Sequence, residues 1–200
     1  MNDLVKNGWQ HFTNQTEKQF LEIANGLGEI IQETNVIVKP DSKALVTSAK
    51  GLGLHTDHHK ANFVAWFCYK QTSEGGETLL LDARKAFALV DKPTQDALKT
   101  IHLFEHKVFE DDDESCPLVY FKEQEIRFYF SFWLMKMELS NTQKRALEVF
   151  YEAIKNTEKV ALKLQKNDIL IVNNHYILHG RNAIVGSQDR FLKRLWITKK

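Results

Sequence analysis

The sequence lacks the features that would indicate an extracellular or membrane-spanning protein. Only two of its 200 residues are cysteines, so a disulfide framework is not expected and a reducing compartment is favoured. No stretch approaches the roughly 18 uninterrupted apolar residues that a membrane helix needs. Residues 1–9 are too polar for the apolar region of a signal peptide. These absences predict a soluble, cytoplasmic protein.

The chain also lacks an excess of charge of either sign. Its 27 basic and 26 acidic residues leave a formal net charge of +1, so there is no electrostatic case for a nucleic-acid partner. It has only three prolines and no linker rich in proline, glycine or serine. A chain of this length without a linker is expected to form one domain, residues 1–200.

The hydrophobic patterning predicts a mainly β protein with flanking helices, an α+β fold. Strand patterns greatly outnumber helix patterns, which favours a β-sandwich or jelly roll with helices outside. Helices are expected at 16–31, at 84–100 as two helices with Pro93 near the second start, and at 141–156 after a cap at Ser140. Strands are expected at 35–38, 61–69, 77–82, 106–110, 117–121, 125–132, 160–164, 168–173 and 191–198.

The most informative motif is Leu54-His55-Thr56-Asp57, together with a distant histidine, His179. Residues i and i+2 of a strand point to the same side, so His55 and Asp57 are expected to reach one metal ion together. With His179 they would form a 2-His-1-carboxylate set, which is typical of non-haem Fe(II) oxygenases. Each part has a simpler interpretation: a solvated turn around His55 and Asp57, and a hydrogen-bonded core histidine at position 179.

The order of several motifs resembles the taurine dioxygenase (TauD/TfdA) and clavaminate synthase branch of the Fe(II)- and 2-oxoglutarate-dependent oxygenases. The matching parts are the H-x-D motif, Glu74-Gly75-Gly76-Glu77-Thr78, Leu178-His179-Gly180-Arg181, Arg190 and Arg194. The resemblance implies a double-stranded β-helix, the jelly roll of that family. It also implies that His55, Asp57 and His179 bind Fe(II), with 2-oxoglutarate and O2 as cosubstrates.

The same resemblance assigns roles to residues around the metal. Arg190, eleven residues after His179, would bind the far carboxylate of 2-oxoglutarate, and the hydroxyl of Thr78 would donate a hydrogen bond to the same carboxylate. An arginine fork suits a carboxylate because it donates two parallel, charge-assisted hydrogen bonds. The alternatives are a surface arginine after a turn and an ordinary strand threonine.

Two further residues are candidates with open alternatives. Arg194, four residues after Arg190, either contacts an acidic group of the primary substrate or forms a structural ion pair. Asn174 either orients His179 or is a turn residue. His58 and His59 are expected to be bystanders, with His59 on the metal side if the strand continues. The aromatic residues from Phe128 to Trp133 are favoured as core rather than as a pocket wall.

The expected activity is oxidation, most simply hydroxylation, of an unactivated C–H bond in a small molecule such as an amino acid, with release of succinate and CO2. Asp57 argues against the related halogenases, which lack this carboxylate. The alternative from another class is a metal-binding jelly roll with a sensing or regulatory role and no turnover. An iron oxygenase independent of 2-oxoglutarate is a third possibility. Arg190 and Thr78 disfavour both, since neither needs to hold a dicarboxylate.

Overall fold

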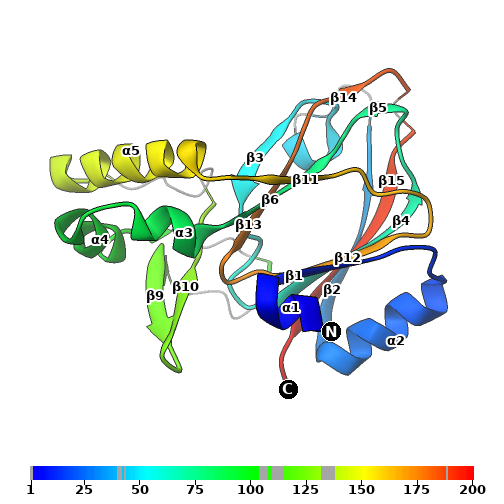
Figure 1. The fold of residues 1–200 in the computed structure, drawn as a ribbon, viewed down its shortest axis with the longest axis horizontal. Helices are drawn as coiled ribbons and strands as arrows, with labels where there is room; N and C mark the ends of the chain where they lie inside the picture. The colour runs from blue at the N-terminus through cyan, green and yellow to red at the C-terminus, as the bar shows by residue number, and fades with distance from the viewer. Residues whose placement is uncertain are drawn as a thin grey trace.

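A five-stranded antiparallel sheet is the largest element of the computed structural model (Figure 1). Its strands, in spatial order, are β1 (Trp9–Phe12), β12 (Ile169–Asn173), β4 (Phe63–Lys70), β15 (Phe191–Thr198) and β2 (Glu29–Ile37). The structure describes residues 2–39, 42, 44–103, 108–109, 115–131, 138–187 and 189–200.

The central strand β4 is buried on both faces, which explains its nearly continuous apolar sequence. On one face Phe63, Ala65 and Phe67 belong to a cluster that includes Phe20 of helix α2 (Glu17–Leu27). On the other face Val64, Trp66 and Cys68 belong to the main core. The sequence prediction of a buried strand at 61–69 is therefore confirmed.

A second antiparallel sheet of four strands completes the jelly roll. Its strands, in order, are β11 (Val160–Leu162), β6 (Thr78–Asp82), β13 (Ile177–Arg181) and β3 (Leu52–His55). Leu80 of β6 and Leu178 of β13 lie in the same core as Val64 and Trp66 of the larger sheet. The two sheets thus share one apolar interior, and the predicted mainly β jelly roll is confirmed.

Short strand pairs and one short helix occupy the connections of the jelly roll. They are η1 (Leu45–Thr47), β5 (Glu74–Gly75) with β14 (Ile184–Val185), β7 (His102–Leu103) with β8 (Cys116–Pro117), and the hairpin β9 (Val119–Lys122) with β10 (Glu125–Phe128).

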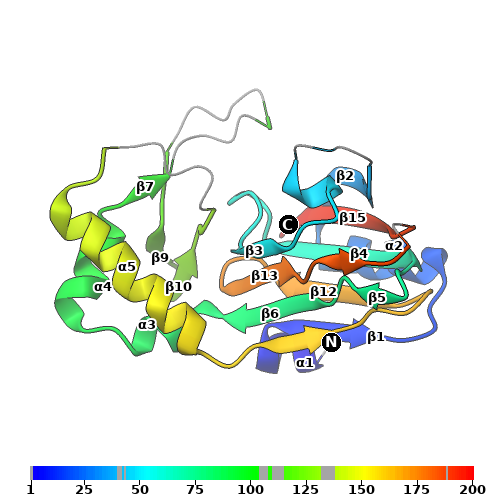
Figure 2. The same cartoon turned by 90° about the horizontal axis from the view of Figure 1, so that it is seen from above.

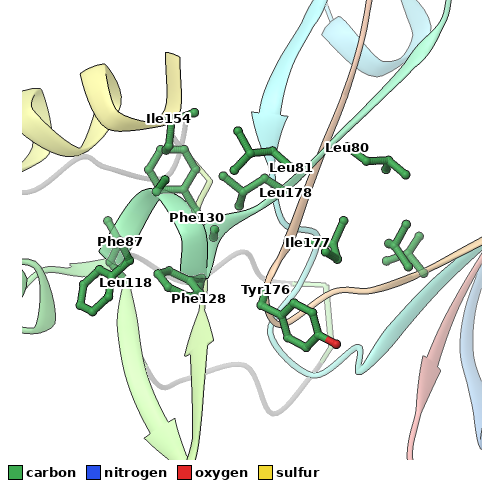
Figure 3. Packing of buried hydrophobic residues seen from close by; sticks show 14 of the residues in the cluster. Leu80, Leu81, Phe87, Leu118, Phe128, Phe130, Ile154, Tyr176, Ile177 and Leu178 are labelled. Carbon is green, nitrogen blue, oxygen red and sulfur yellow. The ribbon is translucent and has the colours of Figure 1, made fainter. Parts of the chain in front are cut away.

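Three helices gather on one side of the molecule: α3 (Ala83–Ala88), α4 (Lys92–Lys99) and α5 (Asn141–Asn156) (Figure 2). Helix α5 has the predicted bounds, and Ser140 caps it in a capping box with Gln143. Figure 3 shows Phe87 of α3 and Ile154 of α5 packed around the buried aromatic rings of Phe128 and Phe130. The preference for core packing at these two rings is confirmed, whereas Phe132 and Trp133 lie outside the described residues.

Some boundaries differ from the sequence expectations. The helix expected at 16–31 ends at Leu27, and Glu29–Ile37 form one long strand because they pair with β15 along its whole length. The short α1 (Asn2–Asn7) and β1 were not predicted, since neither has a clear periodic pattern. The strand expected at 106–110 falls largely on residues outside the description. Among the described residues, no helix is long and apolar enough to cross a membrane.

Candidate metal centre

His55, Asp57 and His179 come together in the interior of the jelly roll. Each offers a ligand atom, and these atoms all lie within 4.8 Å of one another. The Nε2 atoms of His55 and His179 lie 3.6 Å and 3.7 Å from the two carboxylate oxygens of Asp57. Donors bound to one ion at roughly 2 Å lie roughly 3–4 Å from each other, so the donor set fits a divalent metal. The solvated-turn interpretation is wrong, because all three residues are buried.

The pairing of β3 with β13 places the two histidines side by side. His55 is the Cα partner of His179, and their ring centroids are 4.4 Å apart. The next residue, Gly180, makes this approach possible: a Cβ atom there would lie 2.7 Å from the carbonyl oxygen of Leu52. The glycine in the His-Gly-Arg sequence therefore allows β3 to approach closely enough for both imidazoles to share a site.

Asp57 reaches the same place from a loop and not from the strand. Strand β3 ends at His55, so the expected strand alternation through Asp57 is wrong. The chain turns because Thr56 pairs with a different segment: its N–H donates to the carbonyl of Phe130 at 2.9 Å, and its hydroxyl accepts from the N–H of Phe130 at 2.8 Å. This exchange anchors the loop in the core and holds Asp57 beside the histidines.

Asn174 holds the loop after the motif. Its Oδ1 accepts from the N–H of Asp57 at 2.8 Å, and its Nδ2 donates to the carbonyls of His58 and Ala61, each at 3.0 Å. Of the two alternatives for Asn174, the structure has the turn residue: Asn174 follows β12 in the turn before β13, and its amide binds the backbone of residues 57–61 and not His179. Asn174 thereby positions Asp57.

Two donors on β15 bind the carboxylate of Asp57. Arg194 Nη1 lies 3.2 Å and 3.1 Å from its two oxygens, and Trp196 Nε1 donates to Oδ2 at 2.8 Å. Of the two alternatives for Arg194, the structure has the ion pair, and its partner is Asp57. Trp196 was not singled out from the sequence. Strand alternation from Arg194 would have found it, since residues 194 and 196 point to the same side.

The protonation states suit metal binding, which requires neutral imidazole and ionised carboxylate. Burial lowers the pKa of His179 to about 4, and the nearby His55 adds to this effect. For Asp57, burial raises the pKa, but the charge of Arg194 and the two nearby imidazoles outweigh it, so the pKa lies well below its usual range. His55 Nδ1 is 2.8 Å from the carbonyl of Gly53, which directs the other ring nitrogen, Nε2, towards Asp57.

A buried guanidinium precedes β15 at Arg190. The residue is 5% exposed, and its Nε has no hydrogen-bond partner among the described residues. Burial lowers its pKa to about 10, and the charge of Arg181 contributes. Arg181 is the cross-strand partner of Thr78, so both predicted cosubstrate residues lie around Arg181. The surface-arginine alternative for Arg190 is wrong.

His58 and His59 do not continue a strand. His58 is buried, and its ring stacks on Trp196 with centroids 5.7 Å apart. His59 stacks on His58 at 4.5 Å and lines a separate pocket. The expected arrangement, with His59 on the metal side, fails because β3 ends at His55.

A jelly roll that buries two histidines and a carboxylate on facing segments defines the class of non-haem iron oxygenase folds. The chain belongs to the family described as Taurine catabolism dioxygenase TauD, TfdA family, whose sequence model matches residues 2–196. No curated protein matches the sequence directly.

Solved structures with the same fold include an asparagine oxygenase and the non-heme iron oxygenase OrfP. Asparagine oxygenase (AsnO) is 16% identical with a TM-score of 0.80, over 99% of this chain and 75% of that one. Its complex with Fe(II), 2S,3S-3-hydroxyasparagine and succinate is 17% identical with a TM-score of 0.75, over 89% and 63%. The oxygenase OrfP with Fe and alpha-ketoglutaric acid is 17% identical with a TM-score of 0.74, over 92% and 64%. The chain thus spans less than two thirds of the length of two of these three structures.

Proposed function

We propose that this protein is an Fe(II)- and 2-oxoglutarate-dependent dioxygenase that hydroxylates an unactivated C–H bond of a small molecule, an amino acid or another carboxylate. The observation that carries the proposal is the buried group of His55, Asp57 and His179, with all ligand atoms within 4.8 Å of one another. The amino acid products in the related asparagine oxygenase and OrfP structures support the substrate class. The cytoplasmic location expected from the composition stays a prediction.

Each residue of the site has a defined task in this proposal. His55 and His179 supply neutral nitrogen donors, and Asp57 supplies the charged oxygen donor. Arg194 and Trp196 restrict the carboxylate of Asp57 to one orientation by hydrogen bonds at 2.8–3.2 Å. Bound Fe(II) would supply the redox chemistry that couples decarboxylation of 2-oxoglutarate to oxidation of the substrate, releasing succinate and CO2.

Arg190 is the group that favours 2-oxoglutarate over a plain metal site. A buried guanidinium with an unsatisfied N–H is costly unless an acceptor occupies the site in the working protein. The far carboxylate of 2-oxoglutarate supplies that acceptor and neutralises the charge. A metal sensor without turnover has no need of this buried cation.

The test is anaerobic addition of Fe(II) and 2-oxoglutarate, followed by visible spectroscopy. We expect the weak metal-to-ligand charge-transfer band of a chelated 2-oxo acid. Asp57→Ala should abolish the band and substrate-driven succinate formation. Arg190→Gln should raise the 2-oxoglutarate concentration needed for the band at least tenfold while Fe(II) still binds.

The matched controls are Asp189→Asn and Arg145→Gln, which change residues of the same types outside the metal centre. Both should keep the wild-type band. Absence of the band in folded, iron-loaded wild-type protein would reject the proposed function. Full turnover by Asp57→Ala would show that the ligand set is wrongly assigned.

A further inference from the structure

A second hollow lies beyond the metal centre, near the C-terminal end of β15. It has a volume of about 480 Å³, which is large enough for a group of several heavy atoms. Its wall comes from the loop after Asp57, from the β9–β10 hairpin and from the ends of β2 and β15. Figure 1 labels these four strands. We call this hollow the basic pocket. The residues that give it its character are His59, Lys60, Lys122, Arg127 and His175.

The described wall of the basic pocket carries positive charge and no carboxylate. Lys60, Lys122 and Arg127 are cations, and none of the described lining residues is acidic. The acidic residues 111–114 lie outside the described residues, so this positive charge belongs to the described part of the wall. This concentration of charge is not expected from composition, because the whole chain has a formal net charge of only +1.

Arg127 is the deepest of these cations. It is 5% exposed, and its Nε has no hydrogen-bond partner among the described residues. Glu123 and Glu125 lie 3.6 Å and 3.5 Å from Nη2, but their side chains are 74% and 63% exposed, so they offset its charge only weakly. A buried arginine with an unused N–H and an adjoining hollow is arranged to receive an acceptor from a ligand.

The positive charges of the basic pocket also affect the neighbouring His175. Burial, together with the charges of Arg127 and Lys122, lowers its pKa to about 3. Its Nε2 is therefore unprotonated, and the amide of Asn62 donates to it at 3.0 Å. The pocket thus keeps a neutral imidazole among fixed cations.

A series of contacting rings lies between the basic pocket and the metal centre. The His58 ring lies 5.2 Å from that of Phe109 in the pocket wall and 5.7 Å from that of Trp196. The indole of Trp196 in turn donates to Asp57 at 2.8 Å. The basic pocket is thus a neighbouring but separate space, with the buried rings of His58 and Trp196 between it and the metal centre.

We propose that the basic pocket is a binding site, separate from the metal centre, for the carboxylate or phosphate group of a small molecule. Arg127 and Lys122 provide the main contacts. This assignment does not depend on the proposed function, because buried rings separate the pocket from the metal centre.

The test measures binding of two probes, inorganic phosphate and acetate, to the full chain by titration calorimetry and by NMR shifts. Arg127→Gln should weaken binding of the preferred probe about tenfold, the equivalent of about 1.4 kcal/mol. Lys122→Gln, which changes an exposed strand residue and should fold normally, is expected to weaken it about threefold. The control is Lys144→Gln on α5, which should bind like the wild type. Stronger binding of phosphate than of acetate would indicate a phosphorylated ligand, and the reverse a carboxylate ligand.

The proposal is overturned if neither probe binds, or if Lys122→Gln and Arg127→Gln both bind with wild-type affinity. Its failure is distinguishable from that of the proposed function, because the Fe(II)–2-oxoglutarate band is recorded on the same wild-type protein. Probe binding that depends on Lys122 without the band supports the pocket and rejects the dioxygenase. If the band appears but probe binding depends on neither residue, the dioxygenase is supported and the pocket is rejected.

Discussion

At the scale of single residues, the metal centre depends on how its carboxylate is held. Asp57 lies in a loop, and its orientation comes from bonds to Arg194, Trp196 and Asn174, which lie more than a hundred residues further along the chain. Such outer partners of a ligand commonly change metal affinity by about 10–100-fold when removed. The H-x-D motif predicts the ligands, but these distant donors determine the orientation of Asp57.

Trp196→Phe tests this dependence because it removes one hydrogen bond and keeps most of the ring. The stacking of His58 on this position is retained, whereas Oδ2 of Asp57 loses its 2.8 Å donor. We expect metal affinity to fall about tenfold, measured by anaerobic Fe(II) or Co(II) titration. Trp9→Phe, on β1, is the matched control and should bind metal normally. Unchanged affinity in Trp196→Phe would show that Arg194 alone holds the carboxylate.

His175 should make the protein less stable in acid. Its pKa is about 3 in the folded protein and 6.5 in the unfolded chain. Between these values the unfolded chain binds a proton that the folded protein does not, so the free energy of unfolding decreases as the pH falls through this window. The contribution is at most about 1.4 kcal/mol per pH unit.

His175→Gln removes this proton uptake. Urea unfolding between pH 7 and pH 4 should therefore give a shallower loss of stability than the wild type, with the difference growing as the pH falls. His102→Gln, on β7, is the comparison. Parallel pH profiles for wild type and His175→Gln would contradict a buried, neutral His175.

At the scale of elements, the sequence predicted best where local signals and tertiary contacts agree. Helix α5 has the predicted range because Ser140 and Gln143 form a capping box in front of an amphipathic segment. Strand β4 was recognised because both of its faces are buried. Strand β2 was predicted too short, because its N-terminal half is fixed by pairing with β15 and not by its own pattern.

The cap of α5 can be tested directly. Ser140→Ala removes the side-chain acceptor for the N–H of Gln143, which is 3.2 Å away. The free energy of unfolding should fall by about 1 kcal/mol, measured by urea denaturation. Thr142→Ala changes an exposed residue in the first turn without touching the cap, and it should not destabilise the protein. A loss of equal size in both variants would mean that the cap contributes nothing specific.

At the scale of the whole molecule, the larger sheet separates two apolar regions with different tasks. Its inner face shares the main core with the smaller sheet, around the metal centre, while its outer face packs against α2. Changes on the outer face should therefore affect stability without changing the site.

Phe20→Ala provides the test of this separation. Phe20 is fully buried in α2, with its ring 5.6 Å from that of Phe67. Its truncation should cost about 3–5 kcal/mol in the free energy of unfolding. Below the unfolding temperature, metal affinity should match that of the wild type. Val5→Ala, at an 86% exposed position, should change neither quantity. A metal affinity that falls with Phe20→Ala would show that the two regions are coupled.

The sequence by itself determined the proposed chemistry of this protein: the H-x-D motif, the late His-Gly-Arg and the arginine eleven residues later predict the metal ligands and the cosubstrate cation by residue type and order. It also determined most strands and helices, because burial and capping leave periodic signals. Only the tertiary structure decided that Arg194 and Trp196 hold Asp57, that Asn174 supports the loop and not His179, and that Arg127, Lys122 and Lys60 line one pocket. Those relationships join residues far apart in the chain, and no local pattern encodes a contact that exists only after the sheets have packed.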